Sequence, residues 1–246
     1  MQSSRKEQEK GRSLFHRRLT HRTHTRPDNQ LKFLLHRLVA VGRLSCGLAD
    51  RTTVGVHYER LNASVQRSRP GEELTGVLLL YPEHTLLVIE CSTEALLTVL
   101  QDLRLMGENL HSGLIQEPRI LLVSHDLQQR LFQKWSFKLL AESEGRTIVS
   151  EDQSSEQLLS QTLHQVRRLG QHLLSTAGQM TGSTVIPDEV LKDAADVIPP
   201  QAAVCRLVQM EVLLSPARYL STYHTPLHQQ LDSESVWPAL EHLQIV

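Results

Sequence analysis

Two long apolar runs lie close together in the first half of the chain. The first is Leu74–Tyr81 (LTGVLLLY) and the second is Thr85–Glu90 (TLLVIE), with Pro-Glu-His between them. Their length, their aliphatic content and the short connection predict two adjacent strands joined by a tight turn. Near-continuous apolar runs are typical of central strands that are covered on both faces, so we expect a sheet that is buried on two sides.

Periodic segments around these runs predict the remaining elements of one fold. Strands are predicted at 33–44, 120–123 and 135–140, with one or two amphipathic turns at 127–132. Between the first strand and the apolar runs, a helix is capped by Thr53 and has Val56, Tyr58, Leu61 and Val65 on its apolar side. After the runs, a second helix is capped by Ser92 or Thr93 and has Leu96, Leu97, Leu100 and Leu103 in helical spacing. The order βαββαββ describes an α+β, ferredoxin-like sandwich, in which a mixed sheet carries two helices on one face.

A long amphipathic segment follows this unit. Ser154 and Gln157 form a capping box for a helix that ends at Gly178. Its apolar side is formed by Leu159, Leu163, Val166, Leu169 and Leu173. A bare sheet face would leave apolar side chains in water, so we expect this helix to cover the face opposite the first two helices.

The C-terminal part has weaker patterns. Residues 186–197 indicate a short helix-like segment that Pro199-Pro200 stops. In 204–214 the apolar alternation slightly favours an extended form, but Val204, Leu207, Val208 and Leu214 also suit a helix. The predicted organisation is a basic flexible arm at 1–32, the sandwich domain at 33–141, a linker and covering helix at 142–178, and a C-terminal extension at 179–246 whose residues from 217 on form an extended or partner-stabilised tail.

Positive charge is concentrated in the N-terminal arm. Residues 1–26 contain eight Lys and Arg and two Glu, whereas the whole chain has a net charge of −1, so the rest is acidic. Arg17, Arg18, Arg22 and Arg26 are candidate partner-binding residues, which suit nucleic acid or an acidic protein surface such as that of tubulin. The aromatic content of 4% argues against a nucleic-acid binder that stacks bases on aromatic side chains.

The cysteine pattern and the hydropathy predict a soluble protein of the cytoplasm. The three cysteines are widely spaced and include no Cys-x-x-Cys pair, so neither a disulfide framework nor a zinc site is expected. No apolar stretch fits a signal peptide, and no run reaches the roughly 20 apolar residues of a membrane span. Glu7 and Glu9 weaken the interpretation of the Arg-rich arm as a transit peptide.

Candidate catalytic and metal-binding residues are few. His21 and His24 lie in the arm, and Pro226 interrupts the helical spacing of His224 and His228, so we expect solvated histidines rather than metal ligands. Cys91 ends an apolar strand, which is typical of an inert buried thiol. No glycine-rich phosphate loop, Gly-x-Ser-x-Gly or His-Glu-x-x-His motif is present in the sequence. These observations predict a protein without catalytic residues, metal or cofactor.

Four ordered stretches between His36 and Ala141 resemble the BLUF domain, a blue-light sensor that holds flavin between the two helices of a βαββαββ fold. They are HRLVAVGR at 36–43, LTGVLLLY at 74–81, LLVIE at 86–90 and LFQKWS at 131–136, the last being similar to the family's closing Phe-x-x-Trp-Ser segment. Their order and intervals imply a BLUF-type form of the predicted sandwich. The resemblance covers less than half of the chain.

The resemblance also implies which chemistry is missing. In the family, a Tyr on the first strand passes an electron to the flavin, a Gln on the third strand relays the hydrogen-bond change, and an Asn holds the ring edge. These positions align with Ala40, with Leu87, and with Ser68 or Arg69. Each buried polar group of a flavin that lacks a partner costs about 1–3 kcal/mol, so no flavin and no photochemistry are expected. The matching positions that packing alone explains are Thr75, Glu90 and Trp135.

Together these features predict a non-catalytic structural or interaction protein with a degenerate BLUF-like domain. Its surface, arm and tail would join it to a larger assembly, with tubulin or an axonemal scaffold as partner and no membrane. Similarity to a testis-expressed, BLUF-like vertebrate protein implies a place in a cilium or the sperm flagellum, but no reaction. The alternative is a small-molecule or flavin-binding sensor that retains a cleft between the helices at Tyr58–Val65 and Ser92–Leu103. An enzyme of unknown type would need polar groups from distant segments, and nothing in the sequence points to one.

Overall fold

Five strands form a mixed sheet in the part of the chain that the structure describes. The structure is a computed structural model and describes residues 34–109, 112–141, 153–176, 184–192 and 194–224. The strands are β1 (His36–Leu44), β2 (Thr75–Leu80), β3 (His84–Cys91), β4 (Ile115–Ser124) and β5 (Trp135–Leu139), in the order β4-β1-β3-β2-β5. Neighbouring strands are antiparallel except β2 and β5, which run parallel. The predicted α+β fold and the order βαββαββ are confirmed.

The two apolar runs form the predicted pair of strands. β2 and β3 are antiparallel, with Gly76 opposite Ile89 and Leu80 opposite Thr85. Every residue of both strands is buried, as expected for strands with a covered surface on either side. β1 lies on the other side of β3 and begins at His36, later than predicted.

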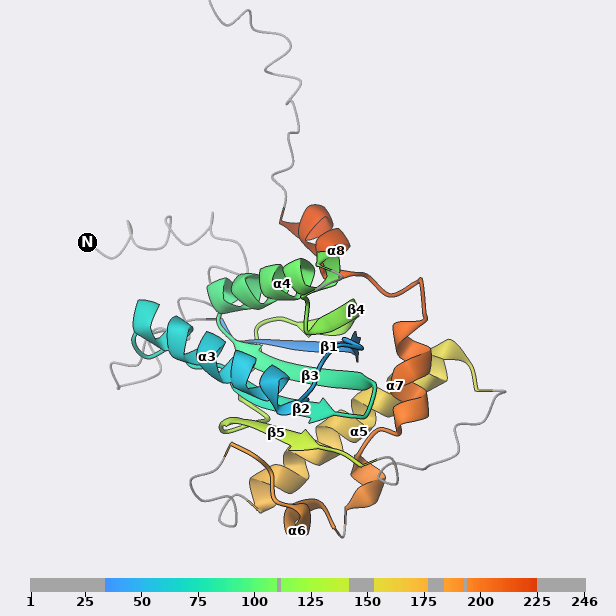
Figure 1. Cartoon of the computed structure of the whole chain (residues 1–246). Helices are drawn as coiled ribbons and strands as arrows, with labels where there is room; N and C mark the ends of the chain where they lie inside the picture. Colours follow the sequence, from blue (N-terminus) through green and yellow to red (C-terminus); the bar gives the residue numbers. More distant parts are fainter. Residues whose placement is uncertain (1–33, 110–111, 142–152, 177–183, 193, 225–246) are drawn as a thin grey trace, which may run out of the picture.

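Helices α3 (Thr52–Ser68) and α4 (Thr93–Glu108) cover one face of the sheet (Figure 1). Tyr58 of α3 and Leu100 of α4 are buried against side chains of the central strands, among them Leu87. The predicted cap of α4 is confirmed, because the Ser92 hydroxyl accepts a hydrogen bond from the Ala95 N–H at 3.3 Å.

The start of α3 differs from the prediction. Thr53 does not cap the helix; instead the Asp50 carboxylate accepts a hydrogen bond from the Thr52 N–H at 2.9 Å. This carboxylate satisfies an amide that a helix leaves free at its first turn. The buried side of α3 is formed by Val54, Gly55, Tyr58 and Val65, whereas the predicted Val56 and Leu61 are half-buried.

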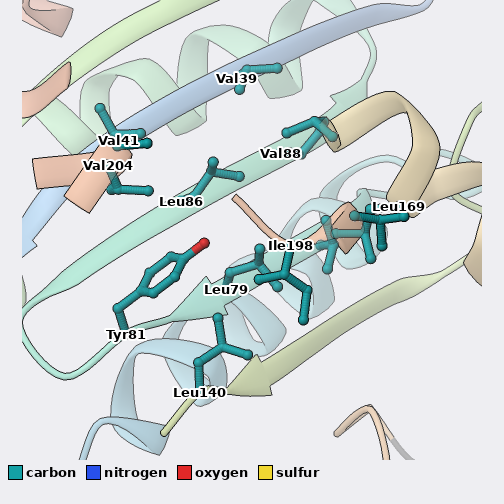
Figure 2. Close-up of a cluster of buried hydrophobic side chains, with 14 of the residues drawn as sticks. Val39, Val41, Leu79, Tyr81, Leu86, Val88, Leu140, Leu169, Ile198 and Val204 are labelled. Carbon is teal, nitrogen blue, oxygen red and sulfur yellow. The ribbon is translucent and has the colours of Figure 1, made fainter. Parts of the chain in front are cut away.

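The opposite face of the sheet is covered by the C-terminal part of the chain. The elements are α5 (Ser155–Ser175), α6 (Asp188–Leu191), the 3₁₀ turn η2 (Ala195–Val197) and α7 (Gln201–Val208). Figure 2 shows Val41, Tyr81 and Leu86 of the sheet region beside Ile198 and Val204 of this layer. The predicted capping box at Ser154 and Gln157 is present, and the predicted covering role of the helix is confirmed.

Two helices form in residues 201–223 of the C-terminal part. Residues 201–208 form helix α7, one of the two forms that the sequence left open for 204–214, because Ala203, Val204, Leu207 and Val208 fall on one helical side and all four are buried. Residues 216–223 form helix α8 (Pro216–Tyr223), although an extended tail was predicted from 217 on. Ser215 caps α8, and Pro216 occupies its first turn, where a missing N–H costs nothing. Residues 225–246 lie outside the described residues.

The C-terminal part also covers both edges of the sheet. At the β4 edge, the Ile120 N–H donates to the Leu214 carbonyl at 2.8 Å. At the β5 edge, Phe137 and Val185 form an isolated parallel bridge. β4 begins at Ile115, earlier than predicted. Glu117, with a positive φ of 49°, and Pro118 interrupt the apolar pattern but do not end the strand. Around these residues the register of β4 against β1 shifts. Among the described helices, none combines the length and the hydropathy that a membrane crossing requires.

Replacing Gly76 with Ala is expected to destabilise the fold severely. Gly76 has a φ of 148°, and a Cβ there would lie 2.0 Å from the Val88 carbonyl oxygen. That oxygen belongs to the neighbouring strand and has no room to move, so we expect a loss of about 3 kcal/mol or more in the free energy of unfolding. Urea denaturation followed by circular dichroism measures the loss.

The matched control is Gly47→Ala. A Cβ at Gly47 would meet nothing within 4 Å, so its effect should stay within about 1 kcal/mol. Equal stability of the two variants would contradict the close approach of β2 and β3 at Gly76.

Candidate functional site

An apolar pair occupies the two strand positions that the BLUF resemblance assigns to redox and amide groups. Ala40 of β1 and Leu87 of β3 are directly opposite each other in the strand register. Each has a relative exposure of 1%, and both belong to the cluster that α3 and α4 cover. The side chains at this point are hydrocarbon, without a hydrogen-bond donor or acceptor.

The third aligned position, at the end of α3, is also without an inward-facing amide. The Ser68 hydroxyl donates to the backbone oxygens of Ser64 and Val65, both at 3.0 Å. Arg69 Nη1 lies 3.2 Å from the carboxylate of Glu94 on α4, and 42% of the Arg69 side chain is exposed. Neither side chain is placed to hold a ring edge in the interior.

Polar and aromatic contacts occupy the region between α3 and α4 that the alternative cleft would need. His57 Nε2 of α3 lies 3.0 Å from both carboxylate oxygens of Asp102 on α4. The neighbouring Tyr58 is buried, with its ring centroid 5.6 Å from that of Trp135 and 5.3 Å from that of His57. The two helices are therefore joined by side chains at this point.

Two buried polar atoms here have no hydrogen-bond partner among the described residues. They are the Tyr58 hydroxyl oxygen and the Trp135 Nε1. Burial raises the pKa of the Tyr58 hydroxyl well above its ordinary value, and the Asp102 carboxylate raises it further, so the group stays protonated. A buried donor without an acceptor lowers the stability of the fold by about 1–3 kcal/mol, so this aromatic pair destabilises the packing of α3 against the sheet.

These residues do not fit a flavin. The polar edge of the ring system presents both carbonyl and N–H groups, and each needs a partner when it is buried. Ala40 and Leu87 provide none, and an indole such as that of Trp135 can only donate.

A buried carboxylate holds the connection between the two edge strands. β4 and β5 lie at opposite edges, so residues 125–134, called the strap below, pass across the ends of the three central strands. The strap contains bends but no helix, so the helical turn predicted at 127–132 is wrong. Glu90 of β3 is 0% exposed and accepts the Leu131 N–H at 2.9 Å and the Phe132 N–H at 3.0 Å. Arg37 of β1 pairs with the same carboxylate at 2.6 Å.

Arg130 ties the second half of the strap to β2 and β3. Its Nη1 donates to the Thr75 hydroxyl at 2.7 Å and to the Glu90 carbonyl at 2.8 Å, and its Nη2 donates to the Glu73 carbonyl at 3.0 Å. Thr75 and Glu90, which the resemblance explained by packing, therefore act through hydrogen bonds. Sequence reasoning missed this network, and the available signal was that Arg37 and Glu90 place opposite charges next to the apolar runs of β1 and β3.

The other predicted residues are placed as follows. Cys91 is buried, and burial raises its pKa to about 12, so the thiol is protonated at neutral pH, as predicted for an inert residue. Arg17, Arg18, Arg22 and Arg26 lie outside the described residues, as do His21, His24 and His228. Across the described ranges, no group of three His, Cys, Asp or Glu side chains could hold a metal ion.

A depression of about 610 Å³ lies along the first turns of α5, in the layer on the far side of the sheet from α3 and α4. Its lining is polar and consists of Gln153, Glu156, Gln157, Ser160, Gln161 and His164. It is open to solvent and shares none of these residues with the Ala40 and Leu87 region.

Comparison with known proteins identifies a family over most of the chain. The model of a family described as testis-expressed protein 47 matches residues 34–225. The predicted similarity to a testis-expressed protein is thus confirmed.

Solved structures of BLUF proteins are similar in fold. The dark state of the BLUF protein BlrB is 22% identical, with a TM-score of 0.33 over 56% of this chain and 86% of that chain. The BLUF domain of BlrP1 is 15% identical, with a TM-score of 0.35 over 64% of this chain and 98% of that chain. A bacterial light-regulated adenylyl cyclase is 17% identical, with a TM-score of 0.34 over 68% of this chain and 41% of that chain. Similarity at this level concerns the fold and says nothing about what this chain binds.

Replacing Tyr58 with Phe is expected to stabilise the protein. The substitution removes a buried hydroxyl without a partner, so the free energy of unfolding should rise by about 1–2 kcal/mol. Urea denaturation of protein purified without added ligand measures the change.

The matched control is Tyr81→Phe. The Tyr81 hydroxyl is also buried but donates to the Pro199 carbonyl at 2.6 Å, so its removal should destabilise by about 1–3 kcal/mol. A loss of stability in both variants would mean that Tyr58 has an acceptor in solution.

Replacing Glu90 with Gln is expected to lower the free energy of unfolding by about 3 kcal/mol or more. Arg37 loses its charge partner, and the new side-chain NH₂ group cannot accept hydrogen bonds from the Leu131 and Phe132 amides. Thermal unfolding of the variant measures the loss. As a control, Glu94→Gln removes the exposed pair with Arg69 and should change stability by less than about 1 kcal/mol. Similar effects of the two substitutions would refute the holding role of Glu90.

Proposed function

Since this chain belongs to the testis-expressed protein 47 family, we propose that it is a non-catalytic interaction protein of the male germ line, in which a degenerate BLUF-like domain serves as a rigid body. It joins a larger cytoskeletal assembly of the cytoplasm, in the sperm flagellum or in a cilium. Its partners are proteins, with tubulin or an axonemal scaffold as the leading candidates, and its action needs no flavin and no membrane.

The observation that carries this proposal is the closed apolar interior. Ala40 and Leu87 face each other under α3 and α4, where a light sensor would need polar groups. The helices above them are joined by the His57–Asp102 and Arg69–Glu94 contacts. Because the Ala40 and Leu87 positions offer no hydrogen bond to a ligand, the surfaces and the charged arm are the parts of the protein proposed for recognition.

The N-terminal arm supports a polyanionic protein partner. Its first 26 residues hold eight Lys and Arg against two Glu, so the arm is attracted to acidic surfaces. The low aromatic content disfavours a target that is bound by stacking of its bases on aromatic rings, as in many single-stranded nucleic-acid complexes.

The alternative function, a small-molecule or flavin sensor, is favoured by one observation. The buried Tyr58 hydroxyl and Trp135 Nε1 lack partners among the described residues, and an acceptor-bearing ligand between α3 and α4 would satisfy them. The two functions are separated by adding riboflavin, FMN and FAD to the purified full chain. The interaction protein shows no flavin absorption after gel filtration and no shift in melting temperature, whereas the sensor shows both.

Neutralising the arm is expected to weaken binding to microtubules polymerised from purified tubulin. The variant replaces Arg17, Arg18, Arg22 and Arg26 with Ala in the full chain. Exposed charge pairs contribute up to about 1 kcal/mol each, so the affinity in co-sedimentation should fall about tenfold or more. Binding of the unchanged protein should also weaken as salt is raised, because dissolved ions screen the attraction between the arm and an acidic surface.

A variant with Lys at the same four positions keeps the charge and should bind like the unchanged protein. Equal binding of the Ala and Lys variants would exclude the arm as the contact. An unchanged protein that fails to co-sediment at low salt would exclude tubulin as the partner.

A further inference from the structure

Two histidines fasten the first half of the strap to the end of β1. His36, the first residue of β1, is 4% exposed, and its Nδ1 lies 2.9 Å from the Nδ1 of His125, the first residue of the strap. The His36 Nε2 lies 2.8 Å from the Thr93 hydroxyl at the start of α4. Two residues along the strap, the Leu127 N–H donates to the Leu35 carbonyl at 2.9 Å.

The strap thus has two halves with different fastenings. The second half is held by Glu90 and Arg130, through an ion pair and backbone hydrogen bonds. In the first half, the contacts to β1 and the residue before it include the histidine pair and the backbone bond of Leu127. We propose that the His36–His125 contact is a proton-operated latch, which holds residues 125–128 against β1 at neutral pH and releases them in mild acid.

The latch follows from the donors and acceptors of the two rings. A hydrogen bond between two Nδ1 atoms needs one N–H and one lone pair. Two neutral rings meet this condition, and so does a pair that carries one extra proton, because the Thr93 hydroxyl can donate to the His36 Nε2 or accept from it. When both rings are charged, two N–H donors face each other at hydrogen-bond distance, and like charges repel. The second proton therefore breaks the contact.

The surroundings make His36 resist that second proton. Burial lowers the pKa of His36, and the nearby His125 lowers it further, while Asp126 opposes both effects. Opposite His36 on β3 is Cys91, which is neutral because burial raises its pKa to about 12. The start of α4 adds Thr93 and the positive end of a helix dipole.

Two charged residues next to the His36–His125 pair form ion pairs with other residues. Arg37 follows His36 on β1 and is paired with Glu90 of β3. Glu94 in the first turn of α4 is paired with Arg69. Among these neighbours, Asp126 is the carboxylate that favours a charged His36.

The direction of the pH effect follows from linkage. A histidine whose pKa is lowered by folding binds fewer protons in the closed state than in the open one. The closed latch is therefore fully stable above the ordinary histidine pKa of about 6.5 and loses stability as pH falls below that value. His84, at the start of β3, has a pKa lowered chiefly by burial and weakens the whole fold in the same range, so a local measurement is needed.

Amide hydrogen exchange on the full chain tests the latch residue by residue. Between pH 7 and pH 5, after correction for the intrinsic rate, the protection factor of the Leu127 amide should fall about tenfold. The Leu131 and Phe132 amides, which Glu90 holds, should keep their protection.

Two variants decide the cause. His125→Gln keeps a side chain that can donate or accept but does not titrate, so the fall in Leu127 protection should be smaller than in the unchanged protein, with only the burial of His36 left to produce it. His84→Gln removes the other buried histidine and should leave the fall at Leu127 unchanged. The proposal is overturned if Leu127 keeps its protection at pH 5, if His125→Gln shows the same fall as the unchanged protein, or if the amides of α5 lose protection in parallel with Leu127.

Discussion

The structure depends on a sheet whose two faces are both apolar. All residues of β2 and β3 are buried, and their side chains alternate between a face toward α3 and α4 and a face toward α5 and α7. Apolar surface left in water costs about 25 cal/mol for each Å². The first two helices cover one face only, so the second face requires the C-terminal part of the chain. The hydrogen bond from Tyr81 to the Pro199 carbonyl and the strand-edge contacts of Val185 and Leu214 fasten that part to the sheet.

Elements with a strong local pattern were predictable from the sequence. The runs that form β2 and β3 are near-continuously apolar. Ser92 and Ser154 are residue types that favour helix starts, and their hydroxyls accept hydrogen bonds from amides in the first turns of α4 and α5. Element boundaries were less predictable. β4 continues through Glu117 and Pro118, because pairing with β1 on one side outweighs the poor strand propensity of those two residues.

Helix α7 shows why short apolar segments remain ambiguous. Val204, Val208 and Met210 alternate with polar residues as they would in a strand, but Ala203 and Leu207 complete a helical side as well. The choice is made by tertiary structure, since the segment packs face-on against the sheet rather than joining it at an edge. The polar network at the sheet end was not predictable for a related reason. Arg37 and Glu90 are 53 residues apart and Arg130 acts from another 40 residues away, so no local spacing links them.

Three buried groups that could take part in chemistry make structural contacts instead. The Glu90 carboxylate accepts from Arg37, Leu131 and Phe132, so its oxygens have partners and are not presented to a substrate. The buried Lys138 pairs with Asp188 and ties β5 to α6, and Cys91 is kept protonated by burial. A general base or a nucleophile needs a free lone pair in reach of a reacting atom. In the described part of the chain, these three groups have no free lone pair within reach of a reacting atom. The His36–His125 pair at the sheet end differs from them, because protonation is enough to change its hydrogen bonding.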